Sequence, residues 1–189
     1  MAKAPAAIRT DRLVLRRWRS SDREPFAVMN ADPEVMRYLV RPLTRKESDA
    51  FVDRIERHFE ERGYGLWAVG VRGEAPFVGY VGLTWWDFQA HFTPAVEVGW
   101  RLARPFWDKG YATEGARAAI KDGFERAGLR EIVSFTVPAN VRSIKVMERV
   151  GMTRDLNGDF EHPNVPLESP LRQHVLYRIA AQAVRTKEG

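Results

Sequence analysis

Residues 104–115 are the part of the sequence with the most specific chemistry. They read Arg-Pro-Phe-Trp-Asp-Lys-Gly-Tyr-Ala-Thr-Glu-Gly. A strand-like segment precedes them and a helical pattern follows. The small residues Gly110 and Ala112 let a ligand approach the backbone. The first helical turn offers unpaired N–H groups and the positive end of a dipole. We therefore expect a site for a phosphate or pyrophosphate; the alternative is an ordinary strand-to-helix turn.

A second polar segment, Pro-Ala-Asn-Val-Arg-Ser at residues 138–143, follows the next predicted strand. Asn140 is a residue type that caps the N-terminus of a helix. The segment should lie beside the first loop, at the carboxyl edge of the sheet, where ligands bind in open α/β sheets. Its position therefore favours a binding site over an ordinary turn.

Composition excludes several other mechanisms. The chain has 189 residues and no cysteine, so it has no thiolate nucleophile, no disulfide and no cysteine-ligated metal. Its four histidines, at positions 58, 91, 162 and 174, have no close metal-ligand spacing, and we expect no metal. The net charge is +5, with acids and bases interleaved, which makes a nucleic-acid partner a poor expectation.

The sequence shows no pattern typical of a membrane span or a secretory signal. No apolar run approaches the ~20 residues of a membrane span, and the first seven residues lack the apolar segment of a secretory signal. We expect a cytoplasmic protein with no membrane partner.

The elements that must position these residues follow the order β-α-α-β-β-β-α-β-α-β-β. We expect one mixed α/β sheet in a single domain, residues 1–189, with its core at about 10–182. Capping-box patterns at Ser21 and Thr44 predict helix starts, and Gly63 predicts a helix end. Predicted strands cover 13–18, 65–71, 77–85, 95–102, 131–137, 174–180 and a short segment near 152–155; residues 157–172 read as a loop.

Residues 97–152 resemble the core of the GNAT acyl-CoA N-acyltransferase superfamily, and more closely its Rim-type subgroup, which acetylates ribosomal-protein N-termini and other amines. The superfamily's pyrophosphate loop has the form Q/R-x-x-G-x-G/A. Residues 107–112, Trp-Asp-Lys-Gly-Tyr-Ala, fill it, with Trp107 in place of Gln or Arg. Segment 96–102 is similar to the family's acetyl-CoA strand, and 140–152 to its N-x-x-[AS]…G-[FM] segment.

The resemblance implies the GNAT fold and acetyl-CoA as co-substrate, with the pantetheine arm between two splayed parallel strands, about 97–102 and 132–137. A backbone amide near Val98 or Gly99 would polarise the thioester carbonyl. The implied cofactor-binding residues are Val98, Gly99, Trp100, Leu102, Trp107, Asp108, Lys109, Gly110, Tyr111, Ala112, Thr113, Asn140 and Ser143.

The implied reaction is direct attack of an amine on the thioester in a ternary complex, because the chain has no cysteine to carry an acetyl intermediate. Glu97 is the candidate base, since a carboxylate in an otherwise apolar strand is costly to bury without a purpose. The alternative is a solvated glutamate on a half-buried strand. An α-amine of pKa about 8 needs only a modest base.

The family's usual general acid is missing. Many members place a tyrosine seven residues after the asparagine, and here that position is Met147. Ser143 could hydrogen-bond the sulfur, or it could simply cap the helix. Tyr177 and Tyr111 are weaker candidates. A thiol of pKa near 8.5 could also leave unaided.

We expect an aromatic and acidic acceptor pocket, because such a pocket suits a cationic amine. The alternative is that the aromatic rings belong to the core and the acids are solvated. The candidates are Trp85, Trp86 and Phe160, accompanied by Phe88, Phe92, Asp155, Asp159 and Glu161, with His162 and His174 as further possible bases.

The sequence thus predicts an N-acetyltransferase for a primary amine, either a protein N-terminus or a small amine. An antibiotic or polyamine acetyltransferase is an alternative, as is a catalytically weak acyl-CoA-binding sensor. A homodimer is compatible with the resemblance.

Overall fold

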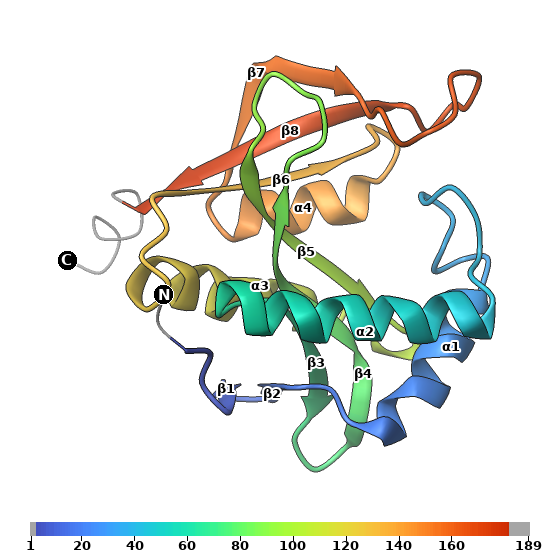
Figure 1. Ribbon diagram of the computed structural model, residues 1–189, viewed down its shortest axis with the longest axis vertical. Coiled ribbons are helices and arrows are strands. Elements are labelled where there is room, and N and C mark those ends of the chain that lie inside the picture. Colours follow the sequence, from blue (N-terminus) through green and yellow to red (C-terminus); the bar gives the residue numbers. More distant parts are fainter. Residues whose placement is uncertain (1–2, 182–189) are drawn as a thin grey trace.

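The chain folds around an eight-stranded sheet with helices on both faces (Figure 1). The structure, a computed structural model, describes residues 3–181, so the ends of the predicted domain at 1–2 and 182–189 lie outside the described residues. The strands are β1 Ala7–Arg9, β2 Leu13–Arg16, β3 Leu66–Val71, β4 Ala75–Trp86, β5 Ala95–Leu102, β6 Glu131–Thr136, β7 Thr153–Glu161 and β8 Gln173–Ala180. Their spatial order is β1-β2-β3-β4-β5-β6-β8-β7.

Only β5 and β6 pair in parallel among these strands; the other neighbours are antiparallel. The α-helices of the described residues are α1 Arg23–Ala31, α2 Arg45–Arg62, α3 Tyr111–Glu125 and α4 Val141–Arg149. Figure 1 shows β1 and β2 at one end of the sheet and β7 and β8 at the other.

Consecutive residues of β4 show which helices cover which face, because neighbouring side chains on a strand point to opposite sides. Tyr80 packs against Phe26 of α1 and Phe51 of α2. Val81 lies against Gly115 of α3, where an added Cβ would come within 3.2 Å of it. Helices α1 and α2 therefore cover one face of the sheet, and α3 covers the other.

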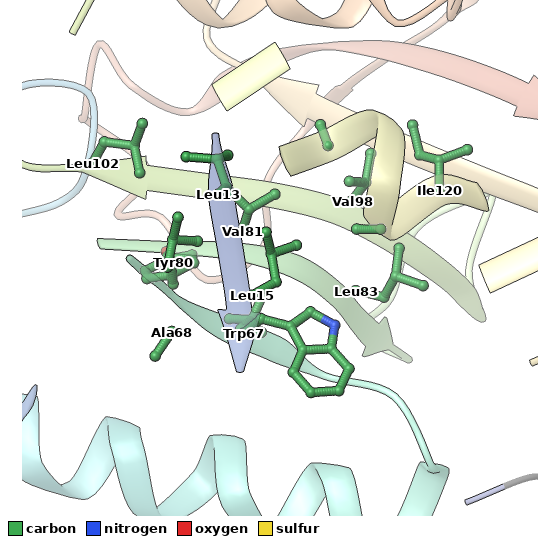
Figure 2. Packing of buried hydrophobic residues seen from close by; sticks show 14 of the residues in the cluster. Leu13, Leu15, Trp67, Ala68, Tyr80, Val81, Leu83, Val98, Leu102 and Ile120 are labelled. Carbon is green, nitrogen blue, oxygen red and sulfur yellow. The ribbon is translucent and has the colours of Figure 1, made fainter. Parts of the chain in front are cut away.

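A single cluster of buried apolar side chains joins the two faces. Figure 2 shows part of it, from Leu13 and Leu15 of β2 to Val98 of β5 and Ile120 of α3. Val96, Val98 and Leu102 bury one side of β5 in this cluster, which fixes the strand's register and leaves its alternate residues on the α1–α2 face.

The predicted element order is confirmed, with two differences in detail. The short edge strand β1 was not predicted. Strand β7 is longer than expected, because residues 157–161, predicted as loop, include partners of β8: Phe160 is opposite His174 and Glu161 opposite Gln173. The loop therefore spans only 162–172.

The two predicted capping boxes have different outcomes. The prediction at Thr44 is confirmed: Thr44 and Glu47 cap each other at the start of α2, and Gly63 ends that helix in a left-handed conformation (φ 72°). The prediction at Ser21 is wrong. Residues Ser20–Asp22 form a 3₁₀ turn, and Asp22 instead accepts the N–H of Arg19 (2.8 Å).

Candidate active site

The loop that joins β5 to α3 exposes a row of backbone N–H groups. Asp108 (φ 59°) and Gly110 (φ 80°) are both left-handed, and alternation of this kind gathers N–H groups into an anion-binding concavity. Helical bonding begins at Glu114, whose N–H donates to the Gly110 carbonyl (3.0 Å). The N–H groups of the first turn before it have no carbonyl of their own helix to bind. The loop therefore fits a phosphate or diphosphate.

Arg12, from the turn between β1 and β2, holds this loop in place. It donates from Nη1 to the Lys109 carbonyl (2.9 Å) and from Nε to the Glu114 carboxylate (2.6 Å). The Trp107 indole donates to the Leu102 carbonyl (2.6 Å). Arg12 was not predicted, because a contact across 102 positions leaves no local pattern.

An open groove of about 600 Å³ runs beside the loop along the outer side of α3. Its lining includes four cations and two acids. The positive excess suits an anionic ligand at the start of α3. The charged residues are Arg12, Arg117, Lys121, Arg149, Asp11 and Glu114.

The polar side chains of the loop are already engaged elsewhere in the protein. Lys109 Nζ pairs with Glu74 (3.0 Å), and the Tyr111 hydroxyl donates to the same carboxylate (3.0 Å). Asp108 pairs with Arg142 (3.5 Å). Ala112 and Thr113 are mostly buried in the first turn of α3. The loop therefore offers its backbone rather than these side chains.

Strands β5 and β6 separate beyond a single point of pairing. Within residues 3–181, Glu97 opposite Val133 is their only register pair. The buried Ser134 hydroxyl donates to the Val98 carbonyl (2.9 Å) next to it. Beyond this point the two strands do not hydrogen-bond to each other as neighbours in the sheet. Backbone N–H and C=O groups around Gly99 are therefore available to hydrogen-bond a ligand that lies between the strands. Ser134 was not predicted, although a serine within an apolar strand was a signal.

Glu97 lies at that point of pairing, on the face of the sheet that α1 and α2 cover. The Trp86 indole N–H donates to its carboxylate (2.6 Å). Burial raises the pKa of Glu97 to about 7, against the lowering effect of that hydrogen bond. An added Cβ at Gly99 would meet only the Glu97 carboxyl group, at 3.9–4.0 Å. A base poised near neutral pH thus borders an open position on β5.

Asn140 begins α4, as expected, and ties it to β6. Its Oδ1 accepts the Ser143 N–H (3.4 Å), and its Nδ2 donates to the Thr136 hydroxyl (2.9 Å). The partly exposed Ser143 hydroxyl forms no hydrogen bond with the rest of the described chain. Met147 is only 1% exposed and belongs to the core, so the position of the family's tyrosine is a packing position here.

The two tyrosines considered as acids lie elsewhere. Tyr177 of β8 directs its hydroxyl toward Glu148 of α4 (3.5 Å). Tyr111 binds Glu74, which precedes β4, whereas Glu97 is opposite Thr84 near the far end of that strand. The structure therefore does not bring Tyr111 to Glu97.

The two predicted acceptor tryptophans have different neighbours. Trp86 bonds Glu97 and contacts Phe88, at 5.7 Å between ring centroids. Phe88 stacks in turn on Phe160 (6.2 Å). The Trp85 ring lies against the Arg62 guanidinium (4.4 Å) instead. Trp86 and Phe160 thus belong to one aromatic cluster, and Trp85 does not join it.

Two histidines complete that cluster. The ring centroids of His162 and His174 lie 5.1 Å apart. Phenylalanine rings contact each of the two histidines. Burial lowers the pKa of both, that of His162 to about 4, where the charges of His174 and Arg172 add to the effect. Both are therefore neutral at pH 7.

The acids expected in the acceptor pocket are each paired with an arginine. The pairs are Asp155–Arg178 (2.7 Å), Asp159–Arg154 (2.7 Å) and Glu161–Arg172 (2.9 Å). These acids therefore do not give the pocket unpaired negative charge.

Over residues 3–181, no group of three or more histidine or acidic side chains is arranged to hold a metal ion. None of the helices described is both long and apolar enough to cross a membrane.

An anion-binding strand–loop–helix beside two separating parallel strands is the framework of an acyltransferase of the N-acetyltransferase class. The model of the acetyltransferase (GNAT) domain matches residues 12–153, and the chain belongs to this family.

Two relatives and one solved structure are similar to this chain. The uncharacterized protein YkkB of Bacillus subtilis is 32% identical over 146 residues, 76% of this chain and 83% of that protein. The FsC-acetyl coenzyme A-N(2)-transacetylase of Aspergillus fumigatus is 32% identical over 163 residues, 80% of this chain and 66% of that protein. An acetyltransferase (GNAT family) from Bacillus anthracis has a similar structure, with a TM-score of 0.76 at 26% identity over 93% of this chain and 99% of that one.

Proposed function

We propose that this chain transfers an acetyl group from acetyl-CoA to a primary amine by direct attack in a ternary complex. The observation that carries the proposal is Glu97, whose pKa of about 7 suits a general base and which lies where β5 and β6 begin to separate. All the residues involved come from one domain of one chain.

Each part of the site has a role in this reaction. When bound, acetyl-CoA supplies an activated thioester. The N–H groups of residues 108–113 bind the diphosphate, and a backbone amide near Val98 or Gly99 polarises the thioester carbonyl. Glu97 takes the proton from the attacking ammonium, directly or through water. The Ser143 hydroxyl hydrogen-bonds the departing sulfur.

The acceptor we propose is of the Rim type or a small amine, with the amino group on the carbon next to a carbonyl group. An α-amine has a pKa of about 8, so a base of pKa about 7 can deprotonate it far more readily than a lysine amine of pKa near 10.4. The Aspergillus relative is named for transfer to an N(2) nitrogen, which supports this class. We also propose a cytoplasmic setting, in line with the absence of cysteine.

A second candidate is an acyl-CoA-binding sensor with weak catalysis. The buried Met147 favours it, because a thioether cannot donate a proton to the thiolate. An antibiotic or polyamine acetyltransferase differs from the first proposal only in its acceptor.

Release of free thiol from acetyl-CoA, measured with a panel of amines, tests these proposals. The panel should contain peptides with free N-termini, amino acids, polyamines and aminoglycosides. Turnover with α-amines is the expected result. Tight CoA binding by calorimetry without thiol release from any amine would contradict the enzyme proposal and support the sensor.

A further inference from the structure

Arg101 is a partly buried cation with no counter-ion in the described part of the chain. Within residues 3–181 it forms no ion pair with a carboxylate, and its one hydrogen bond runs from Nη1 to the Asn30 Oδ1 (2.7 Å). A guanidinium carries five N–H donors, so most of them have no protein acceptor. Arg16, the buried arginine of β2, is different: both its terminal nitrogens bind Asp22 (2.6 and 2.8 Å).

The surroundings of Arg101 hold it in a fixed orientation. Asn30 of α1 is fully buried and donates to the equally buried Ser48 hydroxyl of α2 (2.9 Å). The guanidinium also lies near the rings of Tyr80 (5.4 Å) and Phe51 (5.9 Å). The Asn30–Ser48 hydrogen bond and the two aromatic rings thus hold the guanidinium in one orientation. A cation fixed in this way is preorganised to bind a ligand.

Arg101 shares a face of β5 with the proposed base. Glu97, Gly99 and Arg101 alternate along the strand and point to the side covered by α1 and α2. Gly99 leaves the position between them open. The pKa of the Tyr80 hydroxyl is raised by burial, lowered by Arg101 and raised by Glu97, so the phenol lies within electrostatic range of both charges.

We infer that Arg101 binds a carboxylate on the amine acceptor, several bonds away from the amine that Glu97 deprotonates. This inference rests on the proposed function. Residues four apart on a strand are separated by about 13 Å, so an amine at Glu97 and an anion at Arg101 belong to opposite ends of one small molecule. The acids expected in the acceptor pocket, Asp155, Asp159 and Glu161, are each neutralised by an arginine and would not repel such a ligand.

The diphosphate of acetyl-CoA is a poor alternative partner for Arg101. Its proposed site is the loop that leads into α3, and α3 covers the opposite face of the sheet from α1 and α2. If Arg101 bound the cofactor instead, its substitution would raise the KM for acetyl-CoA. It would also change kcat/KM by the same factor for every amine.

The test uses α-amines in matched pairs, each as the free acid and as the carboxamide: glycine, and dipeptides and tripeptides with a free N-terminus and a C-terminal or side-chain carboxylate. We expect the wild type to favour the acid over the amide at least tenfold in kcat/KM for the longer members. Arg101→Gln should bring that ratio close to one, and Arg101→Lys should give an intermediate value.

Arg45→Gln is the matched control, because Arg45 is an exposed arginine of α2 paired with Asp49 (2.8 Å); it should keep the wild-type ratio. Thermal unfolding of each variant checks folding. A wild-type ratio near one, or a ratio that survives in Arg101→Gln, overturns the inference and leaves the proposed function standing. Absence of thiol release with every amine overturns the proposed function itself, and this inference with it.

Discussion

The indole N–H of Trp86 donates to the Glu97 carboxylate at 2.6 Å, from the neighbouring strand and on the same face of the sheet. The two effects on Glu97 oppose each other. Burial favours the protonated acid, whereas the indole donor favours the carboxylate. Their balance sets the pKa of Glu97 at about 7, where a group accepts a proton from an ammonium and returns it to water with little loss in either direction.

Glu97→Gln should abolish the acid limb of the pH–rate profile. In the wild type, kcat should fall below pH 7, because Glu97 becomes protonated there and can no longer accept the amine proton. The amide cannot act as a base, so we expect kcat at pH 8 to fall by about 10²–10⁴-fold while the KM for acetyl-CoA stays close to that of the wild type. A Glu97→Gln enzyme with the wild-type rate and pH profile would exclude Glu97 as the base.

Trp86→Phe should move the same limb to higher pH. The phenylalanine ring retains aromatic packing against Phe88 but has no N–H to donate. Without that donor the carboxylate loses stabilisation, and the pKa of Glu97 should rise further above its ordinary value. The profile of kcat between pH 5 and 9 measures the shift. An unchanged or lower apparent pKa would show that the indole does not tune Glu97.

Gly110→Val should raise the KM for acetyl-CoA tenfold or more, because a branched side chain would crowd the Arg12 guanidinium, whose Nη2 an added Cβ would meet at 3.4 Å, and disturb the loop that Arg12 holds. Gly128, past the other end of α3, is the matched control: it has a similar φ (69° against 80°), and an added Cβ there would have no neighbour within 4 Å. Both valines carry a comparable backbone strain of about 1–2 kcal/mol. Equal KM values in the two variants would refute the assignment of the loop.

The parts of this site that the sequence predicted are those set by residues close together in the chain. The strand, small residues and helix start of 107–113 lie within one stretch, and Thr44 caps a helix with Glu47 three residues later. The contact of Arg12 with Glu114 spans 102 positions and that of Arg101 with Asn30 spans 71. Contacts of that range arise only from the packed topology.

One error had a signal in the sequence. Residues 157–161 are mostly exposed on the edge strand β7, and their polar composition resembles that of a loop. An edge strand needs few apolar residues, so composition was a poor guide there.

Ser143→Ala should lower kcat by about tenfold, the value of one lost hydrogen bond to a developing charge. The Ser143 hydroxyl is partly exposed at the first turn of α4, whereas the Tyr177 hydroxyl is directed at Glu148. Tyr177→Phe should therefore stay within about twofold of the wild type. Because the Ser143 N–H that Asn140 caps is retained in the alanine variant, unfolding stability should not change. The reverse ranking of the two variants would assign the proton to Tyr177.

Asp22→Asn should be among the most destabilising polar substitutions in the protein. Asp22 and Arg16 form a two-point ion pair, and their side chains are only 2% and 9% exposed. Asparagine leaves the guanidinium charged and buried without a counter-charge, which costs about 3–5 kcal/mol. Glu125→Gln breaks an exposed helical pair with Lys121 (3.7 Å) and should cost no more than about 0.5 kcal/mol. Free energies of unfolding in urea measure both changes. Similar small losses of unfolding free energy in the two variants would mean that solvent reaches the Arg16 guanidinium. In that case, replacing both Arg16 and Asp22 with apolar residues should give no more stability than Asp22→Asn.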